Sequence, residues 1–98
     1  MAKIESKKEF SGKSASECYE ACLSLVNDFG YTLFKKRPIA NLIICNGQVD
    51  GQKMDVSMVV PMTSPTSISV NLSAEDVSED VLNQEAERVL NIISEKLQ

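Results

Sequence analysis

The stretch ANLIICNGQVDGQKMDVSMVVPM, residues 40–62, decides the fold. Asp50-Gly51 favours a two-residue type I′ turn, so the stretch predicts a β-hairpin with strands at 40–49 and 52–62. A turn centred there brings three residue pairs together on one side of the sheet: Ile43 with Met58, Cys45 with Val56, and Gly47 with Met54. A rival turn at Asn46-Gly47 would set Ile43 opposite Asp50, and we reject it because it places a charge against the core face.

The second strand of the hairpin supports this register. Its residues alternate strictly, with one phase apolar throughout: Met54, Val56, Met58, Val60 and Met62. Methionine is unbranched and adapts to varied shapes, so Met54, Met58 and Met62 are candidates for lining an apolar groove under a C-terminal helix. Plain core filling is the alternative for the same row.

The opposite side of the hairpin is also apolar. Leu42 lies opposite Val59 and Ile44 lies opposite Ser57, with all four pointing away from the helices. Leu42, Ile44 and Val59 therefore form a candidate interface for a homodimer, since a two-fold contact needs only one self-complementary patch. Three unrelated surface side chains remain the alternative.

The elements before the hairpin have clear local signals. Residues 2–11 suit a short edge strand, and Ser14 with Glu17 forms a capping box at the start of a helix over 15–29. Gly30 stands where that helix can end, and a strand follows over 31–36. We interpret Lys35-Lys36-Arg37 as a solvated turn, with contact to phosphate or an acidic partner as the alternative.

The elements after the hairpin complete the pattern. Residues 66–73 predict a strand with a polar, solvated outer face, and Asp76 with Glu79 predicts the start of a helix of about twenty residues. The apolar stripe of that helix contains Leu82, Ala86, Val89, Leu90, Ile93 and Leu97.

The order of elements is β-α-β-β-β-β-α, which predicts a single small α+β domain over 1–98: a curved antiparallel sheet with two helices on one face. This order resembles the TATA-binding-protein-like and helix-grip architectures, in which a curved sheet wraps a C-terminal helix. The resemblance rests on element order and implies no activity. The small size of the chain leaves little space for a large ligand cavity.

Composition limits the chemistry. The chain has no histidine, which removes the commonest general base and metal ligand, so we expect no enzyme, no catalytic residue and no cofactor. Cys18, Cys22 and Cys45 lack a fourth soft ligand, and we expect buried, reduced, metal-free thiols. A net charge of −4 and only five aromatic residues argue against nucleic acid. Without a long apolar segment we expect no membrane insertion, and a cytoplasmic location.

The sequence leaves several functions open. The first is a non-enzymatic binding or assembly module that uses its sheet face or the groove under the C-terminal helix, with a protein partner or a second copy. The alternative is a small carrier of an apolar ligand in the methionine-lined interior. An enzyme that uses only carboxylates, lysine or tyrosine is a third hypothesis, and two carboxylates in one pocket, such as Asp55 with a neighbour, would distinguish it.

Overall fold

A computed structural model describes residues 2–97, and its hairpin has the register that the sequence predicts. Asp50 and Gly51 both have positive φ, 52° and 76°, as a type I′ turn requires. The pairs Ile43–Met58, Cys45–Val56 and Gly47–Met54 all form. The hairpin prediction is therefore confirmed pair by pair.

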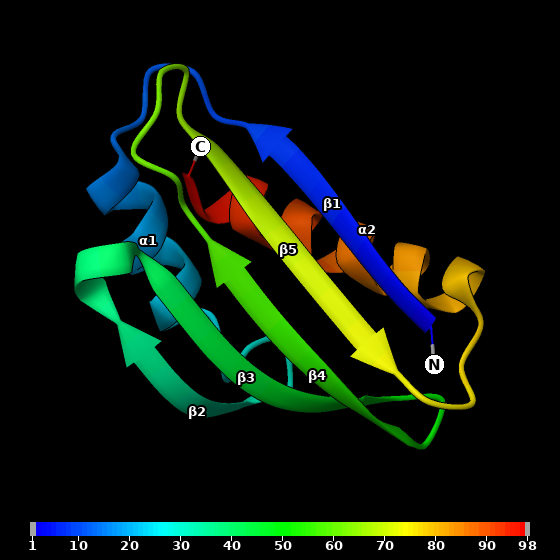
Figure 1. Cartoon of the computed structure of the whole chain (residues 1–98). Coiled ribbons are helices and arrows are strands. Elements are labelled where there is room, and N and C mark those ends of the chain that lie inside the picture. The colour runs from blue at the N-terminus through cyan, green and yellow to red at the C-terminus, as the bar shows by residue number, and fades with distance from the viewer. Residues whose placement is uncertain (1, 98) are drawn as a thin grey trace.

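Residues 2–97 form five strands, two of which make this hairpin, and two helices, so the predicted α+β fold class is confirmed (Figure 1). The bounds are β1 (Ala2–Glu9), α1 (Ala15–Ser24), β2 (Thr32–Arg37), a 3₁₀ turn η1 (Pro38–Ala40), β3 (Leu42–Val49), β4 (Gln52–Val59), β5 (Ser67–Ala74) and α2 (Glu79–Leu97). All strand pairs are antiparallel, in the order β1-β5-β4-β3-β2. The sheet is open, with β1 and β2 as its edges.

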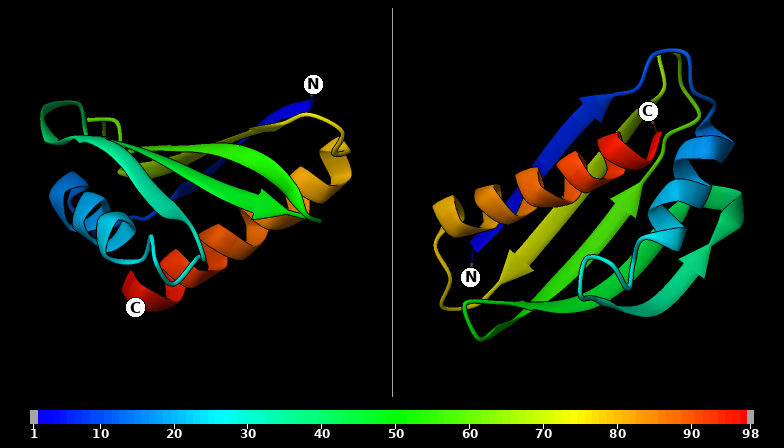
Figure 2. Two further views of the ribbon diagram at one scale, coloured as in Figure 1. Left: turned by 90° about the horizontal axis from the view of Figure 1, so that it is seen from below. Right: turned by 180° about the vertical axis from the view of Figure 1, so that it is seen from behind.

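Both helices lie on one face of the curved sheet, so the other face is uncovered (Figure 2). The core fills the space between helices and sheet. It takes Met54, Val56 and Met58 from β4 and the predicted stripe from α2, namely Leu82, Ala86, Val89, Leu90 and Ile93.

Helix α1 begins as predicted and ends early. Ser14 accepts a hydrogen bond from the Glu17 N–H at 3.0 Å, which confirms the capping box. The helix stops at Ser24 rather than Phe29, and irregular turns lead to Gly30 at φ 86°. The predicted end was wrong because Leu25, Val26 and Phe29 are buried from this irregular segment, which preserves their apolar spacing without a helix.

Helix α2 also corrects one detail. Asp76 has φ 59° and lies outside the helix, and it is Ser78 that accepts a hydrogen bond from the Val81 N–H at 3.3 Å. The predicted cap was wrong because serine caps a helix as well as aspartate does, and Ser78 lies two residues closer to the helix.

Strand β4 is shorter than predicted, and this changes the methionine row. The turn η1 and Asn41, at φ 49°, come before β3, so β3 begins only at Leu42. No residue of β3 therefore pairs with β4 beyond Val59. Val60 is still buried, and its N–H bonds to the Asn41 carbonyl at 3.0 Å. Met62 is 79% exposed. The inward row therefore ends with Met54 and Met58, and the prediction that Met62 points inward was wrong.

Strand β5 has a drier outer face than predicted. Ser67 and Ser69 are buried because β1 and β4 flank β5 on both sides. Glu5 of β1 also reaches across, and its carboxylate accepts a hydrogen bond from the Ser69 hydroxyl at 3.3 Å.

Candidate interaction surface

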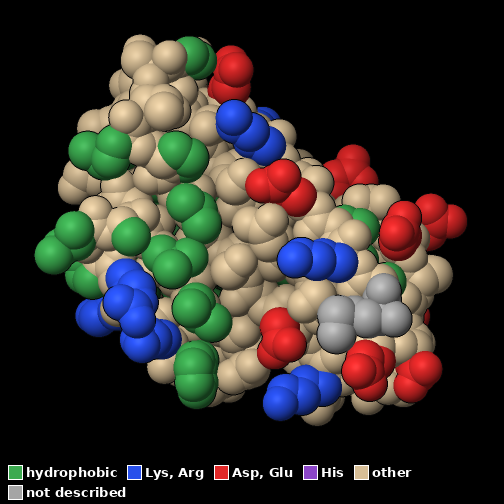
Figure 3. All heavy atoms as spheres, in the orientation of Figure 1, with side chains coloured by type: hydrophobic (Ala, Val, Ile, Leu, Met, Phe, Trp, Pro, Cys, Tyr) green, Lys and Arg blue, Asp and Glu red, His purple; other side chains and the backbone are tan. Residues whose placement is uncertain are grey.

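The uncovered sheet face is divided into an apolar half and a charged half. Strand pairing aligns its residues in rows that run from β2 through β3, β4 and β5 to β1: Arg37, Leu42, Val59, Ser69, Lys7; and Lys35, Ile44, Ser57, Asn71, Glu5. Each row begins basic, becomes apolar on β3 or β4, and turns polar or charged on β5 and β1. Figure 3 shows hydrophobic side chains gathered on the β2–β4 side and charged ones on the β1 side.

The predicted interface residues lie together in the apolar half. Leu42 pairs with Val59, Ile44 lies one row away, and all three are partly exposed. Met62 joins them through Asn41, whose side-chain amide lies 3.1 Å from the Met62 sulfur and 3.2 Å from the Val60 carbonyl oxygen. We call Leu42, Ile44, Val59 and Met62 the outer patch.

A second surface borders the outer patch along β2 and η1. A bulge between Leu33 and Lys35 leaves Phe34 without a partner on β3, and its side chain is 69% exposed. Ile39, in η1, is fully exposed. Between them, Lys35, Lys36 and Arg37 belong to the strand rather than to the predicted turn. We call residues 34–39 the basic edge. The sequence analysis singled out its three basic residues but missed exposed Phe34, because nothing in the sequence marks the bulge.

The methionines predicted to line a groove do not border an opening. Met54 and Met58 are fully buried in the core. Neither of them lines any of five surface hollows formed by residues 2–97. In the structure these two side chains fill space between the sheet and the helices.

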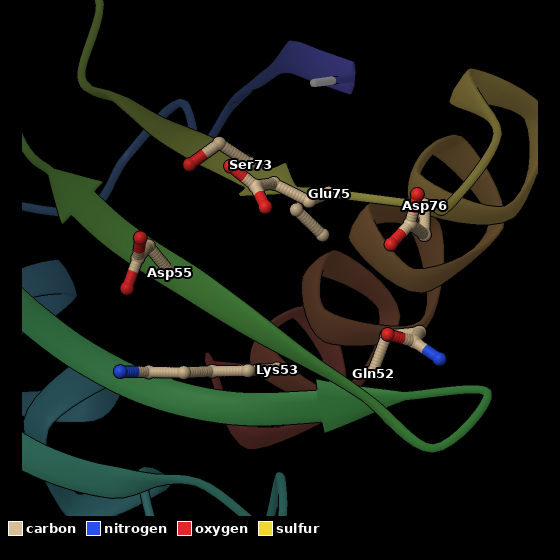
Figure 4. A pocket seen from close by; sticks show the side chains of 7 residues that line it. Gln52, Lys53, Asp55, Ser73, Glu75 and Asp76 are labelled. Atoms are coloured by element: carbon tan, nitrogen blue, oxygen red, sulfur yellow. The ribbon is translucent and has the colours of Figure 1, made fainter.

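One of these hollows, about 270 Å³, is polar and lies beside the ends of β4 and β5 (Figure 4). Its carboxylates are Asp55, Glu75 and Asp76, and the figure shows Asp55 and Asp76 at opposite ends of it. Among residues 2–97 no three metal-ligating side chains come together. The hollow therefore has acidic residues without an arrangement that binds a metal.

All three cysteines lie inside the core. Cys18, Cys22 and Cys45 are completely buried and free. Burial raises the pKa of Cys22 to about 12, with a further rise from the neighbouring thiols of Cys18 and Cys45, and raises the pKa of Cys45 to about 11. These thiols are protonated at neutral pH, which makes them poor nucleophiles.

A partly buried polar cluster joins α2 to the segment before β2. Tyr31 donates a hydrogen bond to Glu85, and Arg88 contacts Glu85 at 2.7 Å and donates to the Phe29 carbonyl at 2.8 Å. Burial alone raises the pKa of Glu85, but the bonds from Arg88 and Tyr31 outweigh it, so the net pKa is below the usual value. Sequence reasoning missed this cluster; the only local signal is the i,i+3 pair of Glu85 and Arg88.

Comparison with known proteins adds no family. No protein-family model and no curated protein matches the chain. Within residues 2–97, neither helix has the length and apolar content needed to cross a membrane. The functional argument therefore depends on the surfaces described above.

Proposed function

We propose that the chain is a non-enzymatic assembly module that associates with a second copy through the outer patch. The observation that supports this is the position of Leu42, Ile44 and Val59 on the sheet face that no helix covers, with exposed Met62 in contact with Asn41 beside them. Contiguous apolar side chains on an uncovered face are typical of contact surfaces.

The geometry of the face suits a two-fold contact. An axis along the boundary of β3 and β4 would set Leu42 of one copy against Val59 of the other. The same operation would set the basic side chains of β2 over the uncharged Ser69 and Asn71 of β5, so no like charges meet. Because the contact residues are only partly exposed, we expect weak to moderate affinity.

Light scattering at tens of micromolar tests the proposal. The wild-type chain should have the mass of a dimer, and Ile44→Lys combined with Val59→Lys should have the mass of a monomer with an unchanged circular dichroism spectrum. A strictly monomeric wild type contradicts the proposal.

A matched control places two lysines elsewhere on the same face. Asn46 and Ser73 lie outside the outer patch, in the next row toward the β3–β4 turn, and the proposed axis sets them over Asp55 and Thr32 of the other copy. The variant Asn46→Lys with Ser73→Lys should remain a dimer. If it also becomes monomeric, added charge rather than the outer patch controls association.

The other functions have less support. An apolar ligand carrier needs an interior space, whereas Met54 and Met58 are packed in the core and border none of the hollows described. A carboxylate enzyme needs two carboxylates at one reacting atom, and Asp55 and Asp76 lie at opposite ends of their hollow. A reducing cytoplasm suits three free buried thiols.

A further inference from the structure

Strand β2 is an edge with an unusual set of exposed side chains. It pairs only with β3, so the backbone groups on its other side have no strand partner. All six of its residues are exposed, including Phe34, and fully exposed Ile39 follows in η1. Open edges attract other strands, and proteins normally protect them with charges, prolines, bulges or short strand length. Protection of the edge against other strands does not explain why exposed aromatic and aliphatic side chains lie beside the charges.

The two edges of the sheet differ in charge. Strand β1 has Lys3, Lys7 and Lys8 interspersed with Glu5 and Glu9, so most of its positive charge is offset locally. Strand β2 has Lys35, Lys36 and Arg37 in succession and contains no acidic residue. Because the whole chain has a net charge of −4, this is a local positive field on an acidic molecule.

We infer that the basic edge binds an extended acidic segment of another protein, in which carboxylates alternate with apolar side chains. The backbone of the segment would pair with Lys35–Arg37, beyond the bulge. Its carboxylates would meet the basic side chains, and its apolar side chains would pack on Phe34 and Ile39. This inference goes beyond self-association, since it uses the edge of the sheet and not its face.

A second copy of the chain is a poor occupant of this edge. Pairing two β2 strands would bring the two basic triplets close to one another, and like charges across paired strands are destabilising. The same charges attract an acidic strand. The basic edge therefore discriminates between the two partners, because it repels a second copy of β2 and attracts an acidic segment.

A nucleic acid or an anionic membrane is also less suited than a short segment. Both are extended arrays of negative charge, and they would meet the acidic remainder of the chain as well as the basic edge. A short segment interacts mainly within a Debye length, about 8 Å at physiological ionic strength, where the local charge is positive. Only a peptide also offers backbone donors and acceptors to β2.

The test uses a synthetic peptide of about ten residues in which glutamate and valine alternate. Added to the ¹⁵N-labelled chain, it should shift the backbone amides of residues 33–39 more than those of residues 3–9. The variant Lys35→Glu with Lys36→Glu should bind about tenfold more weakly or not at all. Lys7→Glu with Lys8→Glu makes the same change on β1 and should bind normally.

Two further peptides test the mode of binding. Replacing the valines by prolines removes backbone donors and should abolish binding, and replacing the glutamates by lysines should do the same. The inference is overturned if the acidic peptide does not bind, if it shifts β1 equally, or if single-stranded DNA or anionic vesicles bind residues 33–39 at least as tightly. Light scattering measures the dimer independently of peptide binding. A chain that is monomeric but binds the peptide would therefore refute self-association and leave the basic-edge inference standing.

Discussion

The ring of Tyr31 occupies the space over Gly47. A Cβ atom on Gly47 would lie 2.5 Å from Cδ1 and 2.8 Å from Cε1 of Tyr31, which is closer than carbon atoms approach. The glycine sits in the middle of β3, where its backbone is not in the left-handed region, so the constraint comes from the neighbouring ring and not from the turn.

We therefore expect Gly47→Ala to destabilise the fold by about 1–3 kcal/mol, because the buried ring must move. Urea unfolding measures this cost. In a Tyr31→Ala background, where the space is free, the same substitution should cost little, as a double-mutant cycle would show. Equal costs in both backgrounds would mean that the ring does not set the constraint.

Glu85 should give the fold a pH-dependent stability. Its folded pKa is below the usual value of 4.5, so its contribution is present above pH 4.5 and is lost as the pH falls through the folded pKa. Wild type should exceed Glu85→Gln in unfolding free energy by about 1–3 kcal/mol at neutral pH. That difference should shrink in acid. Glu87→Gln, at an exposed neighbouring position, is the control, and a pH-independent difference for Glu85→Gln would contradict the assignment.

The cysteines should react slowly with a thiol reagent in native buffer. Cys18, Cys22 and Cys45 are inaccessible, and burial raises the pKa of each, so little thiolate is present. All three should react at once in denaturant. Rapid native labelling, or stoichiometric zinc by elemental analysis, would be inconsistent with a closed core around them.

Val89 should be essential to the core. It is completely buried on α2, so Val89→Asp places an unpaired charge there and should cost about 3–5 kcal/mol, enough to unfold much of the population. Thermal unfolding is the measurement. Asn91→Asp adds the same charge at an exposed site on the same helix and should leave the melting temperature nearly unchanged.

Sequence reasoning succeeded where a local signal determines the structure. Asp50-Gly51 specifies its own turn, the turn sets the register, and the register placed Leu42 opposite Val59 correctly. It failed at Met62 because alternation gives the phase of a strand and not its end. The end of β4 depends on where its partner β3 begins, and the turn η1 before β3 sets that beginning.

The same limit applies to the candidate site. The outer patch could be predicted in part, since Leu42, Ile44 and Val59 follow from the register. The basic edge could not, because the bulge at Phe34 is a product of how β2 meets β3. The pairing of Tyr31 with Glu85 spans 54 residues, and no local pattern encodes a contact of that range.

The pairing of β1 with β5 has a consequence for synthesis on the ribosome. Among residues 2–97, strand β1 has its sheet partner at residues 67–74, so it stays unpaired until that segment has been translated. The β3–β4 hairpin needs only neighbouring residues and can form earlier. During that interval β1 and the open side of β4 are exposed to any strand in reach, and the arrival of β5, which pairs with both, ends the exposure. Nascent chains stalled before and after residue 74 should therefore differ sharply in their resistance to protease.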